Sequence, residues 1–388
     1  MALTFDRQSI EKVYGDSFID GNRVELLYKG RETFSAIFRS IEGASSFICL
    51  HFYIFRNDET GERMAELLKD KARKGVKIYV IYDHFGSLDT PWSFWDDMED
   101  AGVRIRASRP FNWLSPHHYV RRDHRKLIIC DGVKAYTGGL NIADEYGGFL
   151  RRLKRPVWRD TGVLLEGPVA FSLFEIFQKT WQALKGEPIP PTTRPVFPLP
   201  CDQSDFCLSV IPIFASSSKG RRRMRKLIYH SIKNARESIL LTTAYFTPSS
   251  RMLDTLEDAI KRGVEVKLLL PGKSDVMAPY YAGRSSFIRL LRSGVRIFNY
   301  QGEVLHAKTF VFDGCWSIVG SANLDFQSLR WNDEGNVGLL NEVFGKRMTE
   351  VFEEDISHSI EIKEDAWRNR PLPEKIKEKL FVLFRRRL

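Results

Sequence analysis

Two stretches of the sequence follow one spacing rule: HRKLIICDGVKAYTGGLN at residues 124–141 and HAKTFVFDGCWSIVGSAN at residues 306–323. Each fits the pattern H-x-K-x4-D-x6-G-[GS]-x-N. Side chains alternate along a strand, so a histidine and a lysine two residues apart point to the same face. Because the fixed positions occur twice in one chain, the pattern predicts two copies of the same polar site.

The sequence around these motifs is duplicated as well. SIEGASSFICLHFYIF (40–55) aligns with SIKNARESILLTTAYF (231–246), and KGVKIYVIYD (74–83) aligns with RGVEVKLLLP (262–271). Solenoid repeats have periods of ~20–50 residues, and the aligned segments here are separated by a far longer distance along the sequence. The chain is therefore expected to contain one domain twice.

Prolines mark the expected boundary between the two domains. Six of them lie from Pro188 to Pro200, a composition that holds the chain extended and cannot continue a helix. We therefore predict a linker at 186–205. The first predicted domain is 1–185 with the first motif, and the second is 206–388 with the second motif and a basic tail.

Within each half, helix-like and strand-like segments alternate. Glu62–Lys74 has helical spacing and ends at a glycine, and Ile78–Asp83 follows it as a strand. Ile239–Thr243 and Val266–Leu270 are almost wholly apolar, as strands buried on both faces are. This order predicts an α/β fold, in which each domain is a mixed β-sheet flanked by helices.

The paired motifs indicate a site that is shared between the domains. Packing about a pseudo-two-fold axis would bring the histidine, lysine and asparagine of one motif opposite those of the other. Such a cavity suits a phosphodiester: lysine and asparagine bind the non-bridging oxygens, one neutral imidazole attacks phosphorus, and the other protonates the leaving alcohol. This chemistry requires no metal ion, and no cofactor is expected.

The double motif resembles the phospholipase D superfamily, whose HKD signature it matches in both halves. The resemblance covers nearly the whole chain and implies that His124 forms a phosphohistidine and that His306 acts as general acid and then base. Asp131 and Asp313 belong to the catalytic signature, but the resemblance implies a structural role for them, away from the phosphate. The implied phosphate ligands are Lys126, Asn141, Lys308 and Asn323.

The resemblance also implies an acidic residue beyond each motif that orients a histidine. WRDTG offers Asp160 for this role and WNDEGN offers Glu334. Gly139 and Ser321 occupy the same place in the two motifs and are expected to support the site, since glycine lets the backbone come close to a ligand. The first half carries an insertion at 147–158 between its motif and its acid.

Within the superfamily, the sequence is most similar to bacterial cardiolipin synthases of the short, peripheral type. GGLNIADEY (138–146) and SANLDFQSLRWNDEGN (321–336) carry this likeness. Such sequences commonly have Arg-Ser after the second motif, whereas this one has Gln327 and Ser328. The implied reaction makes cardiolipin from phosphatidylglycerol. The alternatives are a hydrolytic phospholipase D, a phosphodiesterase or nuclease of the same superfamily, and a membrane-binding scaffold without enzymatic activity. The intact motifs argue against the scaffold.

The charge of the chain indicates a polyanionic partner. Fifty-nine Lys and Arg against 49 Asp and Glu give a net charge of +10, which favours nucleic acid or an anionic lipid surface. The chain has two motifs, and the sequences beside them resemble those of lipid enzymes. Nucleic acid is therefore the less favoured partner. The five cysteines have no C-x-x-C spacing, so a reduced setting is expected. The sequence shows neither a signal peptide nor a spanning stretch, which predicts peripheral attachment at the cytoplasmic face of the membrane.

Basic segments with interleaved apolar residues are candidates for membrane contact. We expect RRLKRPVWR (151–159) and FVLFRRRL (381–388) to lie at the phospholipid interface. KGRRRMRK (219–226) leads into a helix, so a solvated helix start is the favoured interpretation there. The segments 109–122 and 147–159 flank the first motif and are expected to form an apolar entrance to the site.

Overall fold

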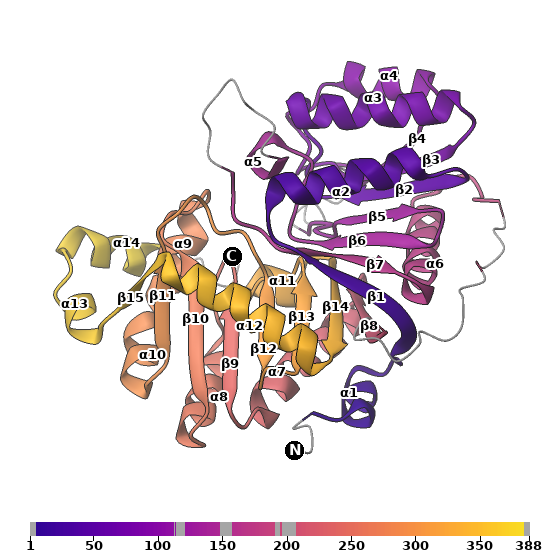
Figure 1. The fold of residues 1–388 in the computed structure, drawn as a ribbon. Helices are drawn as coiled ribbons and strands as arrows, with labels where there is room; N and C mark the ends of the chain where they lie inside the picture. Colours follow the sequence, from indigo (N-terminus) through magenta and orange to yellow (C-terminus); the bar gives the residue numbers. More distant parts are fainter. Residues whose placement is uncertain are drawn as a thin grey trace.

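The computed structural model describes residues 5–111, 113, 121–147, 157–190, 195 and 207–383. Over these residues the chain forms one continuous 15-stranded sheet with helices packed on both faces. The first half lies at the upper right of Figure 1 and the second half at the lower left.

The first half contributes seven strands to this sheet. Its strands are β1 (Ile19–Leu27), β2 (Phe47–Phe52), β3 (Lys77–Asp83), β4 (Arg104–Ser108), β5 (Leu127–Cys130), β6 (Lys134–Gly138) and β7 (Gly162–Glu166). Its helices are α1 (Arg7–Tyr14), α2 (Gly30–Gly43), α3 (Glu59–Arg73), α4 (Trp92–Asp100), α5 (Asp144–Gly147) and α6 (Pro168–Ala183).

The second half repeats this order and then extends it. Its strands are β8 (Leu208–Ala215), β9 (Ser238–Thr242), β10 (Glu265–Pro271), β11 (Arg296–Tyr300), β12 (Thr309–Phe312), β13 (Trp316–Gly320), β14 (Glu334–Leu340) and β15 (Ser359–Ile362). Its helices are α7 (Ser218–Asn234), α8 (Ser250–Lys261), α9 (Met277–Arg284), α10 (Phe287–Ser293), α11 (Phe326–Arg330), α12 (Glu342–Ser357), α13 (Glu364–Arg368) and α14 (Leu372–Val382).

The strand order shows the duplication directly. Outward from the centre, the first half runs β1-β7-β6-β5-β2-β3-β4 and the second runs β8-β14-β13-β12-β9-β10-β11, with β15 at its edge. In each half, three consecutive strands are parallel and the others antiparallel, and β1 joins β8 antiparallel across the centre. The prediction of an α/β fold built from two homologous mixed sheets is confirmed.

The strands of the sheet send alternate side chains into different layers of the core. Phe47 and Cys49 of β2 point into a layer that contains α6 and α12. Ile48 and Leu50 point into a layer of α2, α3 and α4. Since β2 is buried on both faces, it contains an apolar run instead of an alternating pattern. The sheet thereby holds the two halves in a common core.

The predicted elements agree with the observed ones at nearly the same bounds. The helix expected at Glu62–Lys74 is α3, which begins earlier because Asp58 caps it, accepting the Gly61 N–H at 3.0 Å. The strands expected at 78–83, 239–243 and 266–270 are β3, β9 and β10. The domain boundaries stay a prediction. Helix α1, at the start of the chain, packs with α7 and the core of the second half.

Two other observations concern the fold as a whole. Cys49, Cys130 and Cys315 are free and buried, whereas Cys207 is disulfide-bonded, which the cysteine spacing did not predict. In the part of the chain that the structure describes, every helix is too short or too polar to cross a membrane.

Candidate active site

The two motifs meet where the halves touch beyond the central β1–β8 pair. The residue before each motif histidine bridges to the residue before the acid of the other half: Asp123 pairs with Asp333, and Leu305 with Arg159. The backbone N–H of His124 donates to the Asp333 carbonyl at 2.8 Å, and that of His306 donates to the Arg159 carbonyl at 2.7 Å. Backbone pairing across the halves therefore fixes the start of both motifs.

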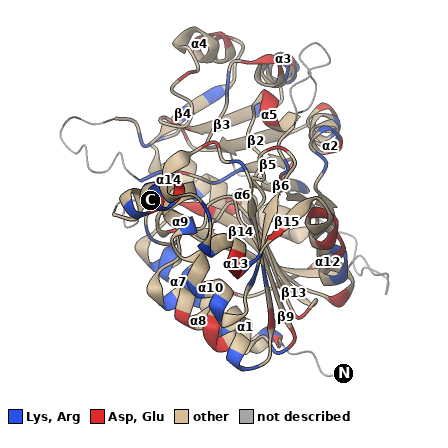
Figure 2. Ribbon diagram, turned by 90° about the vertical axis from the view of Figure 1, so that its left-hand side faces the viewer, with Lys and Arg blue, Asp and Glu red and all other residues tan. Residues whose placement is uncertain are grey.

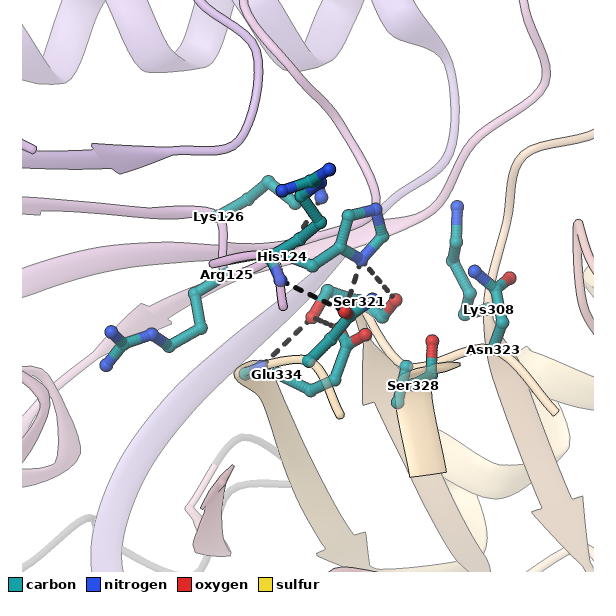
Figure 3. Close-up of polar contacts among 12 residues, drawn as sticks. His124, Arg125, Lys126, Lys308, Ser321, Asn323, Ser328 and Glu334 are labelled. Atoms are coloured by element: carbon teal, nitrogen blue, oxygen red, sulfur yellow. Dashed lines mark hydrogen bonds and ion pairs between the residues drawn. The ribbon is translucent and has the colours of Figure 1, made fainter. Parts of the chain in front are cut away.

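As a result, each histidine contacts the acidic residue of the opposite half. Nδ1 of His124 lies 3.1 Å from Oε2 of Glu334, and Nδ1 of His306 lies 2.8 Å from Oδ2 of Asp160. Figure 3 shows His124 on the first-half ribbon turned toward Glu334 on the second-half ribbon. The family resemblance implied which acids are involved, and the structure shows that each contacts the histidine of the other motif.

Both histidines line one cleft of about 510 Å³. Asn141 and Asn323 line it as well, so residues of both motifs face one cavity. In each ring the two nitrogens lie on opposite sides, and Nδ1 is turned to its carboxylate. Nε2 of each histidine is therefore directed toward the cleft.

Burial controls the charge of both imidazoles. Burial lowers the pKa of His124 well below its ordinary value, and the ammonium groups of Lys126 and Lys308 lower it further. Burial and Lys308 also lower the pKa of His306, but the hydrogen bond and the charge of Asp160 act against this. Both rings are therefore neutral near pH 7 in the empty cleft, and His306 has the stronger support for taking up a proton.

The His124 site is built around a buried carboxyl with a raised pKa. Burial raises the pKa of Glu334 to about 7. The Ser321 hydroxyl donates to Oε2 of Glu334 at 2.5 Å, and the Ser321 carbonyl lies 3.2 Å from Nδ1 of His124. Because a carbonyl only accepts, Nδ1 carries a proton and Nε2 keeps its lone pair.

The His306 site reaches the same arrangement with smaller parts. Asp160 is one carbon shorter than Glu334, and Gly139 stands where the other motif has Ser321. A Cβ added at Gly139 would lie 2.1 Å from Oδ1 of Asp160, so the absent side chain lets the carboxylate come close. The backbone N–H of Thr161 donates to Oδ1 of Asp160 at 2.7 Å. Glycine and serine at one motif position thus match a short and a long acid.

The two lysines lie beneath the histidines. Each is almost completely buried, and neither is part of the cleft lining. Nζ of Lys126 donates to the His124 carbonyl at 2.7 Å, and Nζ of Lys308 donates to the His306 carbonyl. Nζ of Lys308 also lies 2.7 Å from Nδ1 of His306. Because Nδ1 of His306 donates its proton to Asp160, it cannot also accept one from Lys308. We therefore assign the hydrogen bond of Lys308 to the His306 carbonyl.

The lysine charges act on the cleft from this position. Burial lowers the pKa of Lys308 to about 8, which Asp160 opposes. It also lowers the pKa of Lys126 well below the ordinary value, which Glu334 opposes. Direct binding of phosphate oxygens by the lysines stays a prediction, because it requires their ammonium groups to turn from the carbonyls to the cleft.

Each asparagine is held by its carbonyl oxygen. Oδ1 of Asn141 accepts the Ile54 N–H at 3.2 Å, and Oδ1 of Asn323 accepts the Tyr245 N–H at 3.2 Å. The amide oxygen is therefore fixed in both halves. Nδ2 of Asn141 also donates one N–H to the Tyr146 hydroxyl at 3.0 Å, which leaves its second N–H for a ligand. An amide N–H₂ directed into a cleft can donate to a phosphate oxygen.

Asp131 and Asp313 lie outside the cleft, at the far end of β5 and β12. Both are turn residues with positive φ, 53° and 50°. Asp131 accepts the backbone N–H groups of Ser46 and Phe47 at 2.8 and 2.9 Å. Asp313 accepts those of Glu237 and Ser238 at 2.8 and 2.9 Å. This geometry fits the structural role that the resemblance implies, and a catalytic role for either aspartate stays a prediction.

An aromatic wall around the cleft was not expected from the sequence. The ring of Tyr53 lies 5.0 Å from that of His124. Tyr146 and Trp158 lie 5.4 and 5.6 Å from the ring of His306. These residues come from three separate segments, and a single aromatic residue has no sequence signal that would assign it to a cleft.

Several expectations concern other segments. KGRRRMRK (219–226) is not a solvated helix start throughout, because Arg221 is buried and donates to Asp333 at 2.9 Å. Most of the expected entrance (109–122 and 147–159) and the basic ends of 151–159 and 381–388 lie outside the described residues.

Among the described residues, no three His, Cys, Asp or Glu are grouped so that they could hold a metal ion. The metal-independent mechanism stays a prediction.

Comparison with known families agrees with this duplicated site. The family described as cardiolipin synthase, phospholipase D-like domain, matches residues 37–147 and again 228–356. The chain belongs to this phospholipase D-like family. Each matched segment contains one of the two motifs, so each copy of the family domain supplies one motif.

Relatives in sequence and one solved structure resemble the chain over most of its length. Cardiolipin synthase A of Pseudomonas fluorescens is 35% identical over 353 residues, which cover 89% of this chain and 71% of the relative. A probable cardiolipin synthase of Bacillus subtilis is 31% identical, covering 94% of this chain and 72% of the relative. The crystal structure of phosphatidylserine synthase from Haemophilus influenzae has a TM-score of 0.76 at 14% identity, covering 98% and 100% of the two chains, and so shares the fold.

Proposed function

We propose that this phospholipase D-like protein is a phosphatidyltransferase that makes cardiolipin from phosphatidylglycerol through a phosphohistidine. The observation that carries the proposal is the pair of opposed histidines, each held through Nδ1 by a carboxylate of the other half. The cardiolipin synthases among its relatives support the substrate class. The substrate is a phospholipid, and phosphatidylglycerol is our specific assignment.

In the first displacement, Nε2 of His124 attacks the phosphorus of phosphatidylglycerol. A P–N bond forms while the bond from phosphorus to the head-group glycerol oxygen breaks. His306, protonated once the phosphate anion has entered, gives its Nε2 proton to that oxygen, and glycerol leaves. Amide N–H groups of Asn141 and Asn323 stabilise the charge on the non-bridging oxygens.

In the second displacement, a hydroxyl of another phosphatidylglycerol enters. Nε2 of His306, now neutral, accepts the hydroxyl proton while the oxygen attacks phosphorus and the P–N bond to His124 breaks. The products are cardiolipin and a free His124, and the sum of the two steps converts two phosphatidylglycerol molecules into cardiolipin and glycerol. Two displacements at one phosphorus retain its configuration and give ping-pong kinetics.

The two environments support assigning different roles to the histidines. A nucleophile needs an unprotonated Nε2, and burial together with two lysines opposes protonation of His124. A general acid must hold a proton, and Asp160 raises the pKa of His306 against the effect of burial. His124 is therefore the nucleophile and His306 the acid and base.

The setting of the enzyme is part of the proposal. We place it peripherally at the cytoplasmic face of the membrane, because a net charge of +10 attracts anionic lipid. An aromatic cleft wall disfavours water relative to a lipid alcohol as acceptor, which supports transfer over hydrolysis. The same charge would also attract nucleic acid, but the lipid-enzyme relatives favour lipid.

Mass spectrometry of the lipid products tests the function. Incubation with phosphatidylglycerol vesicles should yield cardiolipin and free glycerol, and excess glycerol should reverse the reaction. The His124→Ala variant is the matched control and should yield neither product. Phosphatidic acid as the only product at every glycerol concentration would replace the transferase with a hydrolytic phospholipase D. Cleavage of DNA without lipid turnover would favour a nuclease.

A further inference from the structure

The C-terminal helix α14 has an unusual distribution of side chains. Its aliphatic residues face outward: Leu372, Ile376 and Leu380 are 71, 64 and 54% exposed, and Leu383, directly after the helix, is 77% exposed. Spacings of four, four and three residues place them on one side of a helix. We call these four residues the aliphatic stripe.

The opposite side of α14 attaches the helix to the protein through charge. The Glu378 side chain is 5% exposed and pairs with Arg284 and Arg370. Glu374 also pairs with Arg284, at 3.3 Å, and Phe381 stacks on Tyr281 at 5.8 Å. A surface helix ordinarily turns its apolar side to the core. Here the carboxylates face inward and the aliphatic side chains outward, so packing within the chain does not explain the stripe.

The charge left on the outer surface of α14 is positive. Both glutamates of α14 pair with arginines on the inward side. The lysines of the helix are Lys375, Lys377 and Lys379. On a helical projection, Lys375 and Lys379 lie along one border of the stripe. Lys377 instead contacts Tyr281 and Glu374 on the inward side. Aliphatic residues bordered by lysines are the arrangement of helices that lie in the interface of an anionic bilayer.

Helix α14 is also connected to the active site. It packs against α9, as Figures 1 and 2 both show. The cleft that contains the two histidines is also lined by Pro279 of α9 and by Val276, which directly precedes this helix. Val276 and Met277 are 43 and 57% exposed. The cleft thus has two exposed apolar residues beside it, at the start of the helix on which α14 packs.

We propose that the aliphatic stripe docks on an anionic phospholipid surface and thereby holds the cleft mouth at the membrane. This inference rests on the proposed function, since a lipid substrate must pass from the bilayer into the cleft. Leu372, Ile376, Leu380 and Leu383 enter the acyl boundary, and the lysines at the borders contact lipid phosphates. The docking element is therefore α14 itself, in addition to any contribution from the basic tail.

Vesicle sedimentation tests this docking surface. The probe is a vesicle of phosphatidylcholine with about a quarter phosphatidic acid, which gives the surface a negative charge. Phosphatidic acid has no head-group alcohol, so the enzyme cannot remove one from the charged lipid during the assay. The Ile376→Glu/Leu380→Glu variant should lose at least about tenfold in vesicle affinity, because two charges would enter the acyl boundary. Ile376→Ala/Leu380→Ala, which preserves helix propensity, should lose severalfold.

The matched control places the same substitutions on exposed aliphatic residues elsewhere. Val343 on α12 and Ile360 on β15 are 56 and 61% exposed, and the Val343→Glu/Ile360→Glu variant should keep the vesicle affinity within about twofold of the unaltered protein. Turnover of a short-chain, monomeric phosphatidylglycerol should be equal in all variants, since α14 is outside the cleft. This turnover also shows that each variant is folded.

Three outcomes separate the alternatives. Equal vesicle affinity of the stripe and control variants overturns the proposal. A stripe variant that changes from dimer to monomer and retains its vesicle affinity also overturns it, since the stripe would then contact a second copy of the chain. Stripe-dependent binding by a protein that makes no cardiolipin supports the docking surface and rejects the proposed function, so the two failures can be distinguished.

Discussion

The two halves of the cleft have the same chemistry but are built differently. On one side, His124 contacts the long acid Glu334, whose burial raises its pKa to about 7 and which Ser321 supports. On the other, His306 contacts the short acid Asp160, which lies close because Gly139 has no side chain. The duplicated fold therefore holds two imidazoles in similar positions while giving them different proton affinities.

This difference explains how a symmetric scaffold can carry an asymmetric reaction. A nucleophile and a general acid need opposite protonation states at the same pH. Because each acid comes from the opposite half, a change in one half alters the histidine of the other. Duplication thus allows each domain to tune its partner's motif while keeping its own spacing.

The largest expected effect is the loss of either histidine. His124→Ala and His306→Ala should each lower cardiolipin synthesis at least about a thousandfold. A substrate whose leaving alcohol is already acidic needs no general acid, so His306→Ala should still form a phosphoenzyme from it and His124→Ala should not. Phosphoenzyme trapping measures this, and the reverse result would exchange the two roles.

Replacing the two acids should affect the two histidines unequally. Asp160→Asn should lower kcat about a hundredfold, because His306 loses the charge that supports its protonated form. Glu334→Gln should cost only about tenfold, since the Ser321 carbonyl still accepts from Nδ1 of His124. The pH profile of kcat checks the assignment: Asp160→Asn should shift the His306 limb to lower pH. Equal losses with unshifted profiles would contradict the division of roles.

A smaller effect is expected at the motif position where the halves differ. Gly139→Ala places a Cβ 2.1 Å from Oδ1 of Asp160, so the carboxylate must move and activity should fall about tenfold. Ser321→Gly removes one hydrogen bond to Glu334 and should reduce stability by about 1 kcal/mol with a smaller loss of activity. Steady-state kinetics and thermal unfolding of the two variants test this order. A harmless Gly139→Ala would show that Asp160 does not need the close approach.

The smallest effect concerns stability against pH. The pKa of Glu334 rises from 4.5 to about 7 on folding, so the folded state holds this proton more tightly than the unfolded state. The resulting stabilisation is complete below pH 4.5 and is lost as pH rises through about 7. Glu334→Gln should therefore lose less stability than the unaltered protein over this range. Denaturant unfolding at several pH values measures it, and parallel curves would contradict the raised pKa.

Much of the site follows from local sequence. The repeated spacing of His124 with Lys126 and of His306 with Lys308 predicted two copies of one site. The expected strand placement of these residues was wrong, because they directly precede β5 and β12. Both copies do lie at one cleft, although among the residues of each motif only the histidine and the asparagine line it. The catalytic roles of these residues stay predictions until the variants are measured.

Other features depend on chain pairing that no local pattern encodes. The crossing of Asp160 to His306 and of Glu334 to His124 arises from backbone bridges between segments far apart in sequence. The buried lysines bonded to backbone carbonyls and the aromatic wall around the cleft depend on the same packing. The outward stripe of α14 is similar, since its spacing alone would predict a helix that turns its leucines to the core.

The duplication, the α/β class and the chemical identity of the motif residues follow from the amino-acid sequence alone, because they depend on residue type and short-range period. Three-dimensional packing sets which acid serves which histidine, how each proton is held and which side of α14 faces outward. These properties depend on distance and burial, and a buried charge responds to groups that are near in space, whatever their separation along the chain.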